Sequence, residues 1–328
     1  MIIRYIVFFL LIVTSANTSF CQDADSLIQS SSKKDIKLCY VRPTFLQFSV
    51  RTLPAINNYP NGDKQQNSDY RNNKSYNIKL NFPILSSNKF DIIGQLRYKN
   101  EQLHLGTEIN SKEKEIHFDN MGFSFLMKYK LNTSYYIAGH ASGFLKADKV
   151  NFENYASILD YSGSVLVGKN FDNGEFGLGA LIGNSLGRFR IYPIVLLDYQ
   201  FSDTWKIEMK LPKEIQIRKI IKPDNFYLVG GMEINGSSYF ISEDIYHGVE
   251  NLEYRRAAID FRLGLEKEIY DFLWFGVDFG VSQPIYSALI QSGEPTRNKL
   301  FDFNHSFAPY GSISIFIVPP RALFNKKR

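Results

Sequence analysis

The chain has 328 residues, a formal net charge of +5 and a mean hydropathy of −0.21, yet 27 Phe and 20 Tyr raise its aromatic content to 15%. The positive charge is spread along the chain, which excludes the clustered basic footprint of a nucleic-acid-binding protein. Many aromatics on a slightly polar average are typical of outer-membrane β-barrels, because these proteins place aromatic girdles around a polar lumen.

Residues 1–21 have the features of a secretory signal peptide. Arg4 supplies a positive charge, an apolar run from Tyr5 to Val13 follows, and a polar stretch ends at Ser19 and Cys21. The apolar run is too short to cross a bilayer as a helix. We expect cleavage after Cys21, a short periplasmic leader over residues 22–36, and a single barrel domain over residues 37–328.

Apolar and polar residues alternate along segments of about nine to eleven residues, the length of a tilted membrane strand. In residues 76–82, for example, Asn77, Lys79 and Asn81 alternate with aromatic and aliphatic side chains. Fourteen strands are predicted on this basis, near residues 37–50, 75–83, 89–99, 118–130, 133–144, 158–168, 175–184, 189–201, 204–211, 214–221, 226–234, 252–267, 272–282 and 307–318.

The connections between these strands alternate in length. Every even-numbered connection is short, and several contain the Asn, Asp, Gly or Pro that tight turns need, as in Phe171-Asp172-Asn173-Gly174. The long connections, near residues 51–74, 100–117, 145–157, 235–251 and 283–306, are all odd-numbered. Short periplasmic turns and long extracellular loops give a barrel this parity. The sequence therefore predicts an all-β, antiparallel up-and-down transmembrane barrel of fourteen strands, with twelve as the alternative count and both termini in the periplasm.

Charged residues on the polar faces of these strands are the candidate site residues. If they line a water-filled route, their charges set its selectivity. If they pair with one another across a narrow lumen, they fill it instead. The predicted lumen-facing residues are Lys79, Asp91, Arg97, Lys128, Asp198, Glu208, Arg218, Glu233, Arg256, Asp260 and Arg262.

One pair of residues could carry chemistry. His140 and Ser142 stand two apart on one predicted strand, a spacing similar to that in outer membrane phospholipase A, and Asp160 on the next strand is the available partner to orient the histidine. These three residues define a lipid acyl hydrolase alternative. The other histidines lack a second ligand at metal spacing, so no metal site and no cofactor is expected.

The sequence resembles an uncharacterised outer-membrane β-barrel family of Gram-negative bacteria, carried as a domain of unknown function. The resemblance is clearest from Tyr192-Pro193 through Asp198-Tyr199, in the strand that begins at Trp205, and from Lys210-Leu211-Pro212 to Ile217-Arg218. It implies a barrel in the outer membrane and brings no substrate or catalytic residue. The chain continues past Pro319-Pro320, whereas barrel proteins often end on an aromatic residue of the last strand.

The leading functional hypothesis is a porin-like passive channel or transporter in the outer membrane for a small solute or a lipid-like molecule. The alternatives are a structural or surface-binding barrel with a filled lumen, the lipid acyl hydrolase, and a soluble periplasmic β-sandwich. The expected partners are outer-membrane lipids and lipopolysaccharide, the barrel-assembly machinery during biogenesis and an unidentified small solute or lipid ligand, with no nucleic acid.

Overall fold

The structure is a computed structural model that describes residues 43–53, 73–105, 114–150, 158–185, 188–223, 225–242, 249, 251–294, 298–303 and 307–321. All of these belong to the compact unit Ile36–Arg328. The predicted signal peptide and leader lie outside the described residues and stay predictions. Within the described ranges, no helix is long and apolar enough to span a membrane.

The described part of the chain is built from antiparallel strands. Their bounds are β1 Leu46–Leu53, β2 Asn73–Ser86, β3 Phe90–Leu105, β4 Lys114–Lys130, β5 Tyr135–Ala147, β6 Leu159–Phe171, β7 Gly174–Ser185, β8 Arg188–Ser202, β9 Trp205–Leu211, β10 Glu214–Lys222, β11 Phe226–Ile241, β12 Leu252–Tyr270, β13 Leu273–Gln291, β14 Lys299–Asp302 and β15 Ala308–Ile317.

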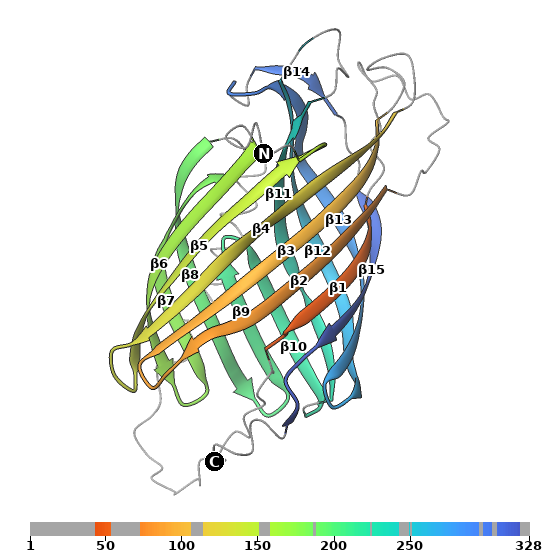
Figure 1. Ribbon diagram of the computed structural model, residues 1–328. Coiled ribbons are helices and arrows are strands. Elements are labelled where there is room, and N and C mark those ends of the chain that lie inside the picture. Colours follow the sequence, from red (N-terminus) through yellow and green to blue (C-terminus); the bar gives the residue numbers. More distant parts are fainter. Residues whose placement is uncertain are drawn as a thin grey trace, which may run out of the picture. The chain divides into compact units, whose positions relative to one another are not determined.

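Fourteen of these strands close into a barrel (Figure 1). Strands β1 to β13 pair with their chain neighbours, β13 then pairs with β15, and β15 pairs with β1, where Phe48 lies opposite Ile315. Strand β14 lies outside this ring and pairs with the end of β13. The predicted all-β antiparallel barrel of fourteen strands is therefore confirmed. We call the end with the tight turns, such as that between β6 and β7, the short-turn end, and the opposite end the long-loop end.

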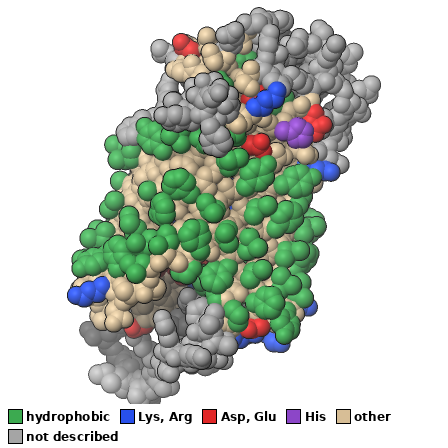
Figure 2. All heavy atoms as spheres, viewed as in Figure 1, with side chains coloured by type: hydrophobic (Ala, Val, Ile, Leu, Met, Phe, Trp, Pro, Cys, Tyr) green, Lys and Arg blue, Asp and Glu red, His purple; other side chains and the backbone are tan. Residues whose placement is uncertain are grey.

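The two faces of the barrel wall differ in chemistry because successive side chains of a strand point to opposite faces. The outward positions are apolar and exposed, as at Val165 (61%) and Phe279 (68%). Figure 2 shows these apolar side chains spread over the face in view. Residues that are paired across neighbouring strands point to the same face of the wall all the way around the ring. The alternation of apolar and polar residues along each strand therefore separates the outer face from the inner face throughout the barrel.

Strands β11 and β13 run further than the sequence predicted. The predicted loops near 235–251 and 283–306 begin too early, because the strands continue to Ile241 and Gln291. Their inner faces carry Tyr239, Ile241 and Leu289, which are buried against β3 and β4. Alternation is hard to recognise there because Gly236 and Ser237-Ser238 interrupt it, and packing against the facing wall compensates for their weak strand preference.

A core of aromatic and aliphatic side chains fills the long-loop end. Its buried members are Leu103, Ile116, Phe118, Tyr239, Ile241, Leu252, Tyr254, Leu289 and Phe303. The ring of Phe118 on β4 stacks on Tyr239 of β11 and Tyr254 of β12, at centroid distances of 4.7 and 5.6 Å. Strand β4 is not a ring neighbour of β11 or β12, so opposite walls meet here. We call this group the end core.

We expect Phe118→Ala to lower the free energy of unfolding by about 3–5 kcal/mol, the usual effect of emptying a buried aromatic site. The matched control is Phe279→Ala on the exposed outer face, where surrounding solvent fills the vacated volume and the loss is much smaller. Denaturant titration of the refolded barrel measures both. Equal losses in the two variants would show that the end core is loosely packed.

Candidate functional site

The interior of the barrel is lined by charged side chains. The register places each of the charged residues predicted to face the lumen on the inner face, opposite the exposed apolar positions. For example, Lys79 lies opposite Arg97, and Glu233 lies opposite Asp260. Both signs of charge therefore share one enclosed surface.

Several of these charges are joined across the interior by ion pairs. Arg256 Nη2 on β12 lies 2.6 Å from Glu101 Oε1 on β3, and Arg51 Nη2 on β1 lies 2.7 Å from Asp260 Oδ2 on β12. Neither pair belongs to neighbouring strands, so each spans part of the lumen. This arrangement is the one expected of a barrel whose charges fill its interior.

Other ion pairs line the wall towards the short-turn end. Lys128 Nζ lies 2.8 Å from Glu175 Oε2, Lys206 bridges Asp198 and Glu208 at 2.9 and 3.1 Å, and Arg218 binds Glu208 and Glu266. Arg262 Nη2 lies 2.9 Å from Glu214 Oε1, and Lys130 Nζ lies 2.8 Å from Asp91 Oδ2. Most of the predicted lumen-facing residues thus have a partner of opposite sign.

Sequence reasoning missed the most buried of these charges, Glu101. Its carboxylate is fully buried and binds both Lys99 and Arg256. Residues 100–117 were predicted as a loop, so Glu101 was not considered. The available signal was the continuation of the period-two pattern from Arg97 through Lys99 to Glu101, which keeps all three on the inner face.

Two contacts between distant strands lie at the long-loop end of the lumen, the end core and a pairing of β11 with β5. Towards this end β11 stays paired with β12 as far as Ile241 and also pairs in parallel with β5, where Phe240 lies opposite Ala147. The Phe240 carbonyl accepts a hydrogen bond from the Asp148 amide at 2.9 Å, and the Asp148 carboxylate accepts one from the Ser242 amide at 3.0 Å. Backbone pairing and apolar packing therefore both oppose axial passage at this end.

The short-turn end has a second inward cluster. Tyr227 stacks on Trp274 at a centroid distance of 5.3 Å, and Trp274 stacks on Phe316 at 5.9 Å. After β15, Val318 is buried against this cluster and donates its amide to the Phe272 carbonyl at 2.9 Å. Arg321 then binds Asp271 in the β12–β13 turn, so the segment Val318–Arg321 lies across this end of the wall.

Backbone pairing around the barrel is interrupted beside the hairpin formed by β9 and β10, the two short strands seen in Figure 1. Pairing between β8 and β9 begins at Val195, and pairing between β10 and β11 stops at Glu233. Among the described residues, Arg188–Ile194 of β8 and Asn235–Tyr239 of β11 have no ladder partner on the sides that face each other. Seven strand residues correspond to about 20 Å along the wall. We call this stretch, in which β8 and β11 are not paired with each other, the side gap.

Pro193 lies on the β8 edge of the side gap. The Gln200 amide points to β7, where it donates to the Asn173 carbonyl, so odd-numbered amides of β8 point to the gap side. Proline has no amide hydrogen, and it is found on strand edges because it cannot donate to a ladder. The residue that lacks a donor therefore lies where β8 lacks a partner.

The structure does not join His140, Ser142 and Asp160 into a catalytic triad. Asp160 binds Lys146 on the neighbouring strand, and the Ser142 hydroxyl lies 2.7 Å from that of Ser162. Within the described chain, His140 forms no hydrogen bond with Ser142 or Asp160. In that same part, no cluster of His, Cys, Asp or Glu residues could hold a metal ion.

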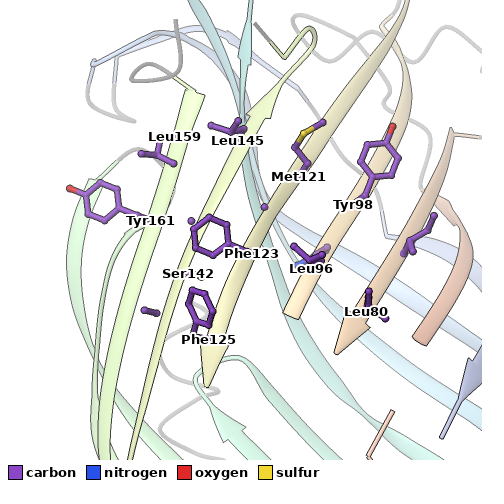
Figure 3. A pocket seen from close by; sticks show the side chains of 15 residues that line it. Leu80, Leu96, Tyr98, Met121, Phe123, Phe125, Ser142, Leu145, Leu159 and Tyr161 are labelled. Carbon is purple, nitrogen blue, oxygen red and sulfur yellow. The ribbon is translucent and has the colours of Figure 1, made fainter. Parts of the chain in front are cut away.

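A hollow on the outer face spans β2 to β6 (Figure 3). Its volume is about 1090 Å³, and Ala141 and Gly143 lie between the bulkier Phe123 and Phe125 on one side and Tyr161 on the other. The lining is almost wholly apolar, so this hollow belongs to the apolar outer surface and not to the charged interior.

Comparison with protein families matches residues 45–283 to the family described as "Domain of unknown function (DUF6268)". No curated protein matches the chain significantly. Among solved structures, LpxR from Salmonella typhimurium is 6% identical, with 84% of this chain and 99% of that chain covered and a TM-score of 0.34. A mutant Rh. blastica porin is 7% identical, with 83% and 98% covered and a TM-score of 0.30. The ferric enterobactin receptor PfeA from Pseudomonas aeruginosa is 8% identical, with 84% and 60% covered and a TM-score of 0.24. These likenesses are too distant to support a conclusion about function.

We expect Glu101→Gln to lower the free energy of unfolding by about 3–5 kcal/mol, because it leaves Arg256 and Lys99 buried without their counter-charge. Asp302→Asn is the matched control, since the Lys299–Asp302 pair is solvent-exposed and should contribute at most about 1 kcal/mol. Denaturant titration of both variants measures the difference. A loss at Glu101 no larger than that at Asp302 would contradict a buried network.

Proposed function

Because the chain belongs to the DUF6268 family, a domain of unknown function, we propose its role from the barrel itself: it resides in the outer membrane and takes up a lipid-like amphipath through its side wall. The observation that carries this proposal is the combination of a buried core at the long-loop end with strand edges in the side wall that are not paired with each other. Axial diffusion of solutes, the porin-like role, is disfavoured because the described residues of the end core lie in its path.

Residence in a membrane is supported by the outer surface. A water-soluble protein rarely exposes contiguous apolar patches larger than a few hundred Å². Here apolar side chains are exposed on the outward positions of every strand from β1 to β8, and again on β10, β12, β13 and β15. Hydrocarbon is the solvent in which such a surface is stable, and a closed ring leaves few backbone groups unpaired in it.

Uptake through the side wall is supported by the edges of the side gap. A strand edge left in hydrocarbon costs several kcal/mol for each unsatisfied backbone group. The gap therefore needs polar contact, either with hydrated head groups at the membrane interface or with the polar part of a bound amphipath. An apolar tail can meanwhile lie against exposed side chains such as Ile191, which is on the outer face of β8.

A structural or surface-binding barrel with a filled lumen is the second candidate, favoured by the ion pairs that cross the interior. Both candidates have a filled lumen, but in this second candidate nothing passes through the side gap. Hydrolysis is not proposed, because Lys146 binds the Asp160 carboxylate that would orient His140.

In planar lipid bilayers, the purified barrel should insert without producing steady conductance. The physical reason is that Phe118, Tyr239 and Tyr254 fill the path at the long-loop end. Single-channel recording is the measurement, and a general porin inserted under the same conditions shows that the assay detects open pores. Steady ohmic steps from this protein would contradict a closed lumen and restore the channel hypothesis.

Lipid uptake should depend on the width of the side gap. Gly236 is exposed on the β11 edge, and a bulky Gly236→Trp side chain should narrow the gap and reduce retained lysophospholipid several-fold, as counted by native mass spectrometry after detergent exchange. Gly311→Trp is the control, because this glycine of β15 has nothing within 4 Å of its Cβ position and lies away from the gap. If Gly236→Trp retains as much lipid as the wild type, lateral uptake is contradicted and the filled-barrel candidate is favoured.

A further inference from the structure

We propose that Lys79, Arg97 and His140 on one wall of the lumen, together with Lys213 at the rim of the side gap on the opposite wall, hold the anionic head group of the amphipath. The ligand class is an acyl chain with a phosphate or carboxylate head. This inference rests on the proposed function, because it names the chemistry of the molecule that enters through the wall. We call the four residues the head-group site.

Lys79 and Arg97 form the part of this site that lies on the paired strands β2 and β3. They lie directly opposite each other on β2 and β3, an arrangement of like charges that destabilises a sheet. In the described part of the chain, neither side chain lies within ion-pair distance of a carboxylate. Most other cations of the lumen have such a partner, as Arg256 does in Glu101. These two residues are thus uncompensated and available to an external anion.

The orientation of Arg97 is set by its neighbours. Arg97 Nε donates a hydrogen bond to Asn77 Oδ1 at 3.2 Å, and its guanidinium carbon lies 6.0 Å from the centre of the Phe144 ring on β5. Gly122 lies between Arg97 and Phe144 in the ladder, and a Cβ at this position would overlap Phe144. Glycine therefore lets the aromatic ring lie over β4 and support the guanidinium.

Lys213 brings positive charge from the opposite wall. It follows Pro212 in the β9–β10 turn, which forms the lower rim of the side gap, and its side chain is 63% exposed. The nearest carboxylate oxygen, Glu233 Oε1, is 3.9 Å from Lys213 Nζ, which is a long ion pair. The turn therefore places an exposed, weakly paired cation at the rim of the gap.

Charges from both walls converge on one region. Lys79 interacts electrostatically with the cations Arg97, Lys99 and Lys213, and with the carboxylate of Glu233. The charged neighbour of His140 is again Lys213. Positive charge is in excess here, whereas the rest of the described lumen is largely paired. An anion would relieve this repulsion, and hydrogen bonds to charged donors are among the strongest that proteins form.

The test compares two lysophospholipids of equal acyl chain, lysophosphatidic acid with its anionic phosphate and lysophosphatidylcholine with its zwitterionic head. Native mass spectrometry of the full barrel in a neutral detergent measures the affinity for each, and inorganic phosphate alone is titrated as a third ligand. The variants are Lys79→Gln and Arg97→Gln. The matched control is Lys128→Gln, another inward lysine, which is paired with Glu175 towards the short-turn end.

We expect the wild type and Lys128→Gln to bind lysophosphatidic acid at least tenfold more tightly than lysophosphatidylcholine. Lys79→Gln and Arg97→Gln should each weaken lysophosphatidic acid binding about tenfold, the usual effect of losing a charged hydrogen bond, and leave the other lipid unchanged. Equal affinity for both lipids would overturn the head-group site and leave lateral uptake standing. Inorganic phosphate binding as tightly as the lipid would overturn the assignment of an amphipath. Failure of both lipids to bind would remove the proposed function itself.

Discussion

Backbone pairing is the constraint on which this structure depends. Hydrocarbon offers amides and carbonyls no partner, so a sheet that meets lipid must bind its own edges. The contact of β15 with β1 satisfies this requirement at the short-turn end, where every strand of the ring has two neighbours. The same requirement applies at the side gap, where the unpaired edges of β8 and β11 need polar contact from another source.

Closure also decides where charge can lie. Because side chains alternate, a ring with an apolar outside has a polar inside, and burial then forces the inner charges to find partners. Glu101 with Arg256 and Asp260 with Arg51 meet this need across the lumen. Lys79 and Arg97 do not, and they lie across the lumen from Lys213, which is at the rim of the side gap. The two irregularities together support a site better than either does alone.

The sequence predicted the ring well because alternation is a local signal. Each strand from β4 to β10 was placed within a few residues, whereas β3 runs to Leu105, into the predicted loop near 100–117. The tight turns at Asn132 and at Phe171–Gly174 marked strand ends by their own chemistry. The end core was not predictable in this way. Tyr239 and Phe118 are more than one hundred residues apart in sequence, and nothing in either segment shows that opposite walls bend together until they stack. The same holds for Glu101, whose partner Arg256 comes from the far side of the lumen.

The short hairpin beside the side gap was predicted correctly, but the gap that it causes was not. The hairpin around Leu211-Pro212-Lys213 was predicted as two short strands, and the structure gives 7 residues to β9 and 9 to β10. Its neighbours β8 and β11 have 15 and 16 residues, so the hairpin leaves Arg188–Ile194 of β8 and Asn235–Tyr239 of β11 paired on one side only. The end predicted for β11 near residue 234 hid this mismatch, because a shorter β11 would have matched the hairpin. An unpaired edge in a barrel is therefore recognised only when the length of a strand is compared with the lengths of its two neighbours. Pro193, which has no amide hydrogen to donate, lies on the edge of β8 that this comparison identifies.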